Sequence, residues 1–337
     1  MATLGSTAVT LMDIQRRLDP NSQVATIIEL MSKQNEILDD VTFMEGNLPT
    51  GHKTTIRTGL PTVQFRSYNE GVAASKSATR QVTEECAMMD AFGQVDKALA
   101  DLSGNAAAFR LTEDAGQLEA MNQLFSQTLF YGDPTTSPKK FLGLAPRLYA
   151  PTTDDTSAGF NLINGGGSGS DNCSIYLVGW GERAASCIYP KGSKGGFQMD
   201  DLGEQTCYDS NQNMFQGYRS HYKWDCGLVV RDWRYVVRIC NIDVSNLVSG
   251  SSAADLIKLM INATERVPNI DGAKFAFYVP RVVRQYLRHQ ILSKASYSLS
   301  WENFAGRKAL AFDGIPVRRC DSLLTSEATI SGTFASL

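Results

Sequence analysis

The sequence predicts a protein of the α+β class, and three observations support that prediction. Apolar side chains between residues 112 and 131 recur every three or four positions, which is the period of an amphipathic helix. Residues 222–242 alternate apolar and polar side chains as a half-buried strand does. Strand-like and helix-like runs then follow one another in the last third of the chain.

The predicted long helix carries one apolar stripe along residues 112–131. Thr112 is the predicted N-cap, with acidic side chains in the first turn, and Gly132 and Pro134 end the helix. The stripe consists of Ala115, Leu118, Met121, Phe125 and Leu129, and Leu124, Thr128 and Tyr131 widen it. Periodicity alone fits an ordinary core helix of an α/β protein equally well.

A long hairpin is predicted before this helix. Residues 53–57 and 62–68 alternate as strands do, and residues 80–88 can return as a second strand. Residues 69–79 between them are small and polar, as in a hairpin tip, and residues 90–102 have a helical pattern. An isolated hairpin is only marginally stable in water, so this one needs a partner surface. A hairpin on the surface of its own monomer is the alternative.

Two strands, or one bent strand, are predicted over residues 222–242. The apolar side chains change from even to odd positions, so a bulge or turn is expected at Arg231 and Asp232. The charges here, including Arg231 and Arg234, are most simply those of a solvated or ion-paired face. Residues 174–178 form a buried strand, and residues 181–219 are a long excursion of low hydrophobicity.

The remaining segments predict short helices and strands. At the N-terminus, residues 10–18 and 22–38 read as two short helices. A capping-box pattern at residues 252–255 precedes a helix that reaches Val267. Residues 275–279 form a buried strand, and Pro280 takes the first position of the next helix.

Composition excludes several classes of protein. The 337 residues are 43% hydrophobic with a net charge of −3, so no basic excess marks a nucleic-acid binder. No apolar run reaches the roughly 18 residues of a membrane span, and the first residues lack the pattern of a signal peptide. The seven cysteines include no C-x-x-C pair and are predicted to be reduced core thiols.

No catalytic, cofactor or metal site is predicted. His52, His221 and His289 lie in different elements, and no phosphate loop, nucleophile elbow or zinc-protease motif is present.

Four motifs resemble a known family. The run LFYGD at residues 129–133, followed by FLGL at 141–144, resembles the spine helix of tailed-phage major capsid proteins with the Hong Kong 97-like fold. FAFYVPRVVRQYL at residues 275–287 resembles the core of the axial domain, and GIPV at 314–317 resembles the closing strand. Residues 224–239 resemble a segment of one subgroup of short-tailed-phage coat proteins.

The resemblance implies a division of the chain. Its parts are an N-terminal arm (1–47), an extended hairpin loop with a return helix (48–102), a peripheral domain with the spine helix (103–150), an axial α/β domain (151–312) with an insertion at 181–248, and a closing strand with a C-terminal tail (313–337). The extended loop is expected to lie over an adjacent subunit.

The function implied by the resemblance is that of a structural shell protein that is not an enzyme. Subunits are expected to form hexamers and pentamers that close an icosahedral shell around double-stranded DNA, which they contact weakly on the inner face. Expected partners are a portal protein and a separate scaffolding protein, with room for a decoration protein and no role for a membrane. Assembly is expected in the cytoplasm of the bacterial host, and the final location is the virion.

Five residues are predicted to contact neighbouring subunits: Arg66, Lys76, Arg80, Arg231 and Arg234. Because the arm-like pattern begins near Thr10, the mature N-terminus is expected at Met1 or Ala2. An encapsulin-type compartment with the same fold, and a soluble α/β enzyme without a recognisable motif, are the alternative functions.

Overall fold

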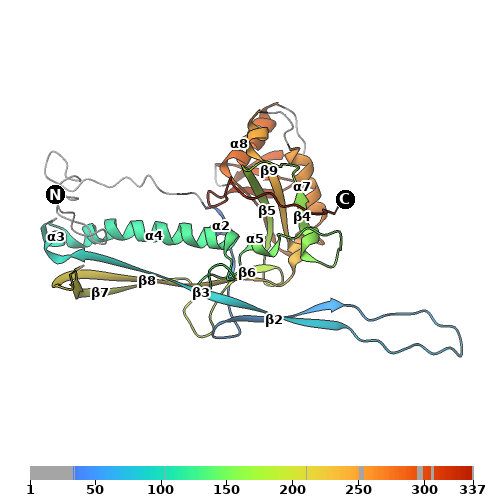
Figure 1. Cartoon of the computed structure of the whole chain (residues 1–337), viewed down its shortest axis with the longest axis horizontal. Helices are drawn as coiled ribbons and strands as arrows, with labels where there is room; N and C mark the ends of the chain where they lie inside the picture. Colours follow the sequence, from blue (N-terminus) through green and yellow to red (C-terminus); the bar gives the residue numbers. More distant parts are fainter. Residues whose placement is uncertain are drawn as a thin grey trace. The chain divides into compact units, whose positions relative to one another are not determined.

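The computed structural model describes residues 33, 35–102, 104–209, 211–249, 254–293, 299–304 and 307–335. The predicted helix at residues 10–18, and most of the one at 22–38, lie outside these residues. The chain divides into two compact units, and β3 (Ala78–Asp96), α4 (Ala106–Tyr131) and β8 (Met214–Val230) each contribute to both (Figure 1). None of the described helices is long and apolar enough to cross a membrane.

The first unit contains the described ranges Met88–Phe125 and Gly196–Asp225. Here β7 (Phe197–Tyr208) pairs antiparallel with β8, and β8 lies between β7 and β3. A short helix, α3 (Lys97–Leu102), follows β3. Val95, Ala100 and Phe109 form a small core that joins β3, α3 and α4, and the Phe125 ring stacks on Trp224 at 4.4 Å.

The long helix is confirmed, but its predicted start is wrong. Helix α4 begins at Ala106, where the Asn105 side chain accepts a hydrogen bond from the Ala108 amide at 3.1 Å. Thr112 lies inside the helix, and its hydroxyl donates to the Ala108 carbonyl. Asn105 is therefore the N-terminal cap. Of the predicted stripe, Met121, Phe125 and Leu129 are buried, whereas Leu118 is exposed.

The second unit contains the remaining elements, with Lys33–Ala87, Ser126–Gly195 and Cys226–Leu337. Its further helices and strands are α2 (Ile37–Asp40), β1 (Phe43–Glu45), β2 (Gly51–Gly59), α5 (Leu144–Arg147), η1 (Ala158–Asn161), β4 (Leu162–Asn164), β5 (Asn172–Trp180), β6 (Ala185–Tyr189), η2 (Trp233–Tyr235), β9 (Val236–Asp243), α6 (Val244–Ser249), α7 (Leu256–Glu265), η3 (Ile270–Gly272), β10 (Lys274–Val279), α8 (Arg281–Ser293), β11 (Leu299–Phe304), β12 (Arg307–Phe312) and β13 (Ile315–Arg319).

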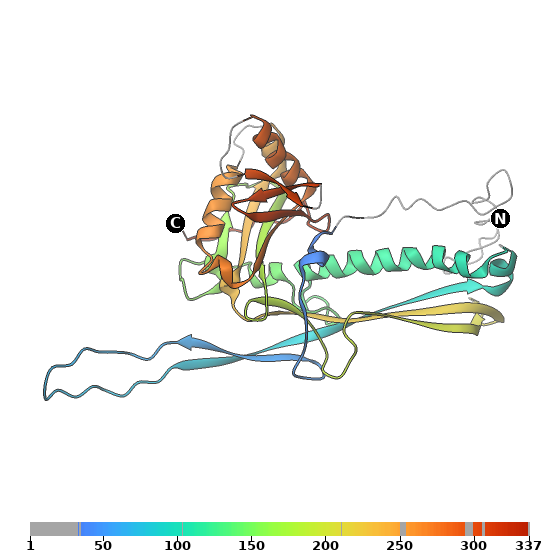
Figure 2. The same cartoon turned by 180° about the vertical axis from the view of Figure 1, so that it is seen from behind.

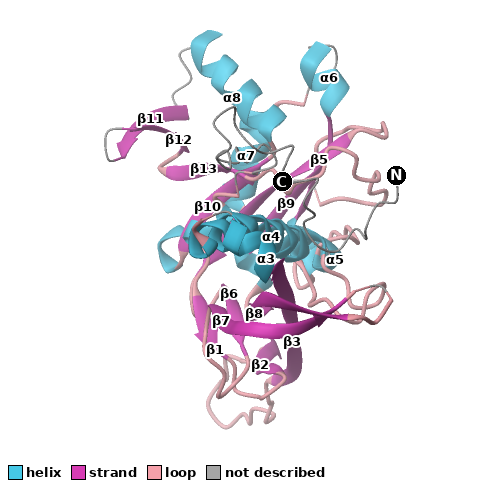
Figure 3. Ribbon diagram, turned by 90° about the vertical axis from the view of Figure 1, so that its left-hand side faces the viewer, coloured by secondary structure: helices cyan, strands magenta, loops and turns pink. Residues whose placement is uncertain are grey.

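A mixed sheet covered on both faces forms the centre of this unit (Figure 3). Strand β5 is antiparallel to both β9 and β10, and β10 is parallel to β13. Side chains at odd positions of β5 and β10 pack with α7 and α8 in one apolar cluster. At even positions, Tyr176 and Tyr278 contact Phe130 at the end of α4. Burial on both faces explains why these strands read as continuous apolar runs.

The buried acid Asp40 fastens α2 to this sheet. Its carboxylate lies 2.9 Å from Lys274 Nζ and 3.1 Å from Arg318 Nε, and it accepts a hydrogen bond from the Tyr278 hydroxyl. The side chain of Asp40 is fully buried, so these partners supply the interactions that water would otherwise give.

The predicted break at Arg231 and Asp232 is confirmed, because β8 ends at Val230 and Asp232 caps η2. The predicted strand at 275–279 and the helix after Pro280 are also confirmed. The capping-box prediction is corrected: Asp255 caps α7 by accepting from the Lys258 amide. The excursion at 181–219 contains β6, β7 and the start of β8, which the sequence did not predict. Most of β7 is exposed, so many of its side chains are polar and they give no clear hydrophobic pattern.

Close backbone packing explains the two glycines in the LFYGD and FLGL motifs. The Gly132 amide donates to the Thr128 carbonyl, and the Gly143 amide donates to the Gly132 carbonyl, both at 2.7 Å. A Cβ on Gly132 would lie 2.3 Å from the Phe141 carbonyl oxygen, and one on Gly143 would lie 2.8 Å from the Phe130 carbonyl oxygen. Only glycine lets the backbone segments approach this closely.

Candidate inter-subunit surfaces

The extended hairpin is confirmed, with different limits from those predicted. Strands β2 and β3 pair antiparallel from Gly51 and Glu85 to Gly59 and Ala78, and residues 60–77 continue beyond them as a loop (Figure 2). The predicted strand at 62–68 is wrong. Its side chains alternate as in a strand, but no ladder pairs its backbone, and the Ser75 hydroxyl donating to the Thr62 carbonyl is a single side-chain contact across the loop.

The predicted helix at residues 90–102 is wrong in its first half. Strand β3 continues to Asp96, and only Lys97–Leu102 is helical. The Phe92 ring stacks on His221 of β8, with 4.5 Å between the ring centroids, and the His221 Nε2 lies 3.1 Å from an Asp90 carboxylate oxygen. These cross-strand contacts within the first unit outweigh the helical spacing of the apolar side chains.

The outgoing side of the loop exposes large apolar side chains. Leu60, Val63, Phe65 and Tyr68 are exposed by 81%, 89%, 107% and 98% respectively. Single exposed apolar residues are common on soluble proteins, but a run of them on one short segment marks an interaction site. The described residues of the same chain do not cover this segment.

The predicted contact residues form no single cluster in the structure. Arg66, Lys76 and Arg80 are exposed on the hairpin. Arg66 Nη1 reaches the Glu70 carbonyl at 3.3 Å, and this contact stays within the loop.

Arg231 and Arg234 make their contacts at the end of β8. Arg231 donates to the Glu182 carbonyl at 2.6 Å, and the exposed Arg234 pairs with Asp232 at 2.7 Å. These two arginines have partners inside their own chain, as the simpler interpretation of the charges predicts.

A buried histidine lies at the base of the hairpin. His52 in β2 has Nε2 3.0 Å from Arg231 Nη2, and its Nδ1 accepts from the Asn47 amide at 3.3 Å. Burial, together with the positive charge of Arg231, lowers the pKa of His52 below its ordinary value of 6.5. The neutral imidazole is therefore the form that suits this position.

A charged pair that the sequence did not predict joins the hairpin to α5. Arg147 donates to both carboxylate oxygens of Glu84, at 2.5 and 2.6 Å, and to the carbonyls of Leu142 and Leu228. Its Nε is buried and has no hydrogen-bond partner among the described residues. The pair lines a cavity of about 160 Å³ that is otherwise mostly apolar.

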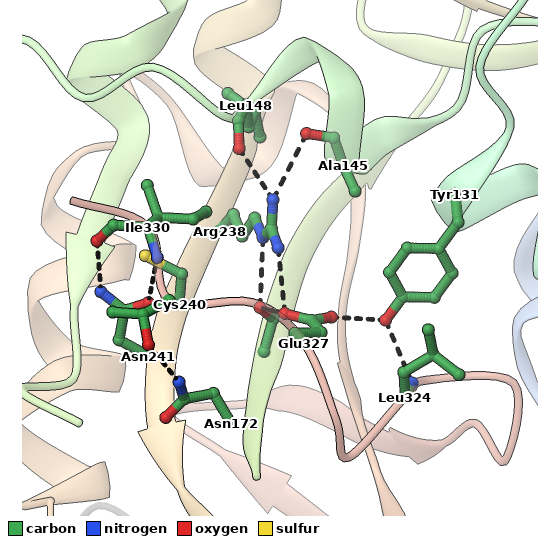
Figure 4. Close-up of polar contacts among 12 residues, drawn as sticks. Tyr131, Ala145, Leu148, Asn172, Arg238, Cys240, Asn241, Leu324, Glu327 and Ile330 are labelled. Carbon is green, nitrogen blue, oxygen red and sulfur yellow. Dashed lines mark hydrogen bonds and ion pairs between the residues drawn. The ribbon is translucent and has the colours of Figure 1, made fainter. Parts of the chain in front are cut away.

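A buried polar network holds the segment after β13 against the sheet (Figure 4). Glu327 accepts hydrogen bonds from the hydroxyls of Tyr131 and Ser174, and its carboxylate lies 2.9 Å from Arg238 Nη2. Arg238 also donates to the carbonyls of Ala145 and Leu148.

Further along the chain, hydrogen bonds also hold the same segment. Asn241 and the backbone of Ile330 exchange two hydrogen bonds of 2.8 and 2.9 Å. The sequence offered one signal for this network: Arg238 is the only charge in the run from Tyr235 to Cys240, and a charge buried in an apolar strand needs a partner.

The described residues contain no group of three or more His, Cys, Asp and Glu side chains that could hold a metal ion. All seven cysteines are free thiols, and all except Cys86 are buried. Burial raises the pKa of Cys173, Cys240 and Cys320 to about 12, so these thiols stay protonated and unreactive at neutral pH.

A long hairpin with an uncovered apolar loop, a spine helix and a sheet covered on both faces define a shell-forming subunit with the Hong Kong 97-like fold. The family model for "Major capsid protein GP7" matches residues 19–331, and the chain belongs to this family. It is therefore a structural, non-enzymatic protein of the tailed-phage virion.

Solved structures agree with the family. A chain in a cryo-EM structure of bacteriophage Epsilon15 is 37% identical, with a TM-score of 0.75, and the match covers 98% of this chain and 100% of that one. No curated protein sequence matches the chain.

Two weaker similarities are also found. A chain of the bacteriophage JBD30 capsid (9% identity, TM-score 0.45, covering 87% of this chain and 92% of that one) and a chain of the SrpI encapsulin complex from Synechococcus elongatus (11% identity, TM-score 0.40, covering 69% and 96%) are too dissimilar to carry an argument.

Proposed function

We propose that this protein closes the phage shell as hexamers and pentamers, with each hairpin loop lying on a neighbouring subunit. The observation that carries the proposal is the run of exposed apolar side chains from Leu60 to Tyr68. Exposing this much apolar surface is unfavourable in a lone subunit and becomes favourable once a second subunit covers it.

The charged residues beside the loop have a smaller role in the same contact. Arg66, Lys76 and Arg80 are exposed and can meet acidic groups of the neighbouring subunit. Exposed ion pairs contribute only about 0–1 kcal/mol each. A shell repeats the contact in every subunit, so their combined effect on assembly exceeds their effect on folding. Arg231 and Arg234 are the less favoured contact residues, because both already have partners.

The partner proteins follow from the proposed role in the virion. Assembly uses a separate scaffolding protein, a portal protein occupies one vertex, and the inner face contacts packaged double-stranded DNA weakly. The net charge of −3 supports weak contact, since strong DNA binding requires a basic surface. A decoration protein can bind the outer face. The division into arm, hairpin, peripheral domain, axial domain and closing strand describes how the subunit is used in the shell.

Sedimentation and electron microscopy of the purified protein, expressed alone and together with a candidate scaffolding protein, test the proposal. Capsomer rings or closed shells are expected, and more of them with the scaffold. If the protein remains a compact monomer or dimer at high concentration, and the scaffold changes nothing, the proposed assembly is wrong.

A further inference from the structure

We propose that Tyr68 of one subunit inserts its ring into the cavity beside Arg147 of a neighbouring subunit. The inference rests on the proposed shell assembly and adds the pair of sites that holds two subunits together. Both sites belong to the second unit of the chain.

The cavity has the size and lining of a site for one aromatic ring. Its volume is about 160 Å³, and its apolar lining includes Val82, Leu144, Leu148, Val230 and Trp233. A cavity of about 150 Å³ lined by apolar side chains is large enough to hold benzene. No described side chain of the same chain fills it.

The cavity has one polar edge. Glu84 and Arg147 line it together with the apolar side chains, and Arg147 uses its two terminal nitrogens on Glu84 and on backbone carbonyls. Because Glu84 neutralises Arg147, the site suits an uncharged ring with a polar tip. A tyrosine brings an apolar ring and a hydroxyl that can hydrogen-bond to the charged pair, whereas a phenylalanine ring leaves this edge unpaired.

The backbone around Tyr68 is held in a defined turn. Tyr68 lies at the corner of a tight turn that the Glu70 amide closes by donating to the Ser67 carbonyl at 3.3 Å. Asn69 beside it has a left-handed φ of 62°, which asparagine tolerates better than most residues, and the Glu70 side chain accepts from the Ser67 amide. The turn therefore presents the Tyr68 side chain, which is 98% exposed. A tyrosine side chain has only two rotatable bonds and loses little entropy on binding, and this type of residue dominates many interfaces.

The two sites imply a head-to-tail contact between copies. The loop extends away from the rest of its unit (Figure 2). None of the residues that line the cavity belongs to the loop at residues 60–77. A protrusion on one face that fits a pocket on another makes a heterologous interface, which closes into rings when the rotation permits. This is the contact that a hexamer or pentamer requires.

Photo-cross-linking in assembled shells tests the location directly. Tyr68→p-azidophenylalanine, which keeps a single ring, is introduced, and shells are assembled from a mixture of isotopically light and heavy subunits. The expected product joins the peptide around residue 68 of one subunit to residues 82–84, 144–158 or 230–236 of another. A cross-link to another surface, to residues 1–32, or within one subunit overturns the pocket assignment.

Two substitutions test the energetics. Tyr68→Ala and the cavity-filling Ala158→Phe should each raise the subunit concentration needed for assembly by about tenfold or more. The double variant should be no worse than the more impaired single variant, because both remove the same contact. Tyr208→Ala, at a tyrosine 55% exposed in β7, is the matched control and should assemble normally.

If Tyr68→Ala assembles as well as this control, the inference fails while the shell function stands. If the unmodified protein forms no shells, the proposed function fails instead.

Discussion

Arg238 and Glu327 form an ion pair, 2.9 Å between Nη2 and Oε2, in which both side chains are only 6% exposed. The pair fastens the segment after β13 to strand β9, and through the Tyr131 hydroxyl it also contacts the end of α4 (Figure 4). Charges that are this deeply buried are tolerable only because each has several partners.

Glu327→Ala is expected to lower the free energy of unfolding of the unassembled subunit by about 3–5 kcal/mol, because it leaves Arg238 buried without its counter-charge. Urea denaturation measures the loss. Replacing both partners, as Arg238→Met with Glu327→Leu, should recover part of it. Glu204→Ala is the control, because it breaks the exposed pair with Lys97 and should change stability far less. Equal losses at Glu327 and Glu204 would contradict the importance of the buried pair.

Gly132→Ala is expected to destabilise the subunit by about 1–3 kcal/mol, since the added Cβ would lie 2.3 Å from the Phe141 carbonyl oxygen, which is backbone and cannot swing aside. Gly116→Ala, inside the α4 helix that Gly132 follows, is the control, because nothing lies within 4 Å of its Cβ position. It should stabilise the subunit by about 0.5–1 kcal/mol, the usual gain when alanine replaces glycine inside a helix. Thermal denaturation should show a lower melting temperature for Gly132→Ala and a higher one for Gly116→Ala. An unchanged melting temperature of Gly132→Ala would show that the close backbone contact does not require glycine.

Deletion of Val72 to Ser77 should leave the fold of the subunit intact and reduce the yield or the melting temperature of shells. These residues make few contacts inside the chain, and Ser75 with Thr62 is the hydrogen bond that the deletion removes from the loop. Circular dichroism of the unassembled subunit is compared with particle counts by microscopy. Lys76→Ala removes the charge but keeps the length of the loop, and it should reduce the yield of shells much less than the deletion does. The opposite outcome would be that the deletion unfolds most of the subunit while the fraction that still folds forms normal shells. That result would mean that the loop stabilises its own subunit and not the contact between subunits.

The stability of the subunit should fall as the pH drops below 6.5, and His52 should account for part of the fall. Its pKa is lowered in the folded state, so between the folded pKa and 6.5 the unfolded chain binds more protons. Stability therefore rises with pH in that window and is lost as the solution becomes acidic. His52→Gln should flatten this dependence between about pH 5 and pH 7. His289→Gln, at an exposed position of α8, is the control for the loss of a histidine elsewhere in the chain. Identical slopes in the three proteins would disprove the role of His52.

The sequence predicted well the elements whose pattern is set by burial. The end of α4 at Gly132, the buried strand β10 and the break after β8 all follow from apolar periodicity and turn residues. The order of motifs also predicted the family, although each motif by itself is short.

The wrong predictions share one physical cause. The periodicity of a segment carries no information about partners that are distant in the sequence. Residues 90–96 carry a helical pattern, yet Phe92 pairs with His221 across more than a hundred residues of sequence. Residues 62–68 alternate like a strand because their apolar side chains suit a surface that their own subunit does not supply. The pair Arg147–Glu84 and the network at Glu327 join segments that are remote in sequence, so no local pattern encodes them.

The protected thiols make the subunit a convenient platform for chemical labelling. Every cysteine except Cys86 is buried, so a thiol reagent added to the native protein should react little with the natural cysteines. A cysteine placed at an exposed loop position such as Lys139 would then be addressable at one defined point per subunit. Because the shell repeats each subunit, a fluorophore or a ligand attached there would be displayed as a regular array.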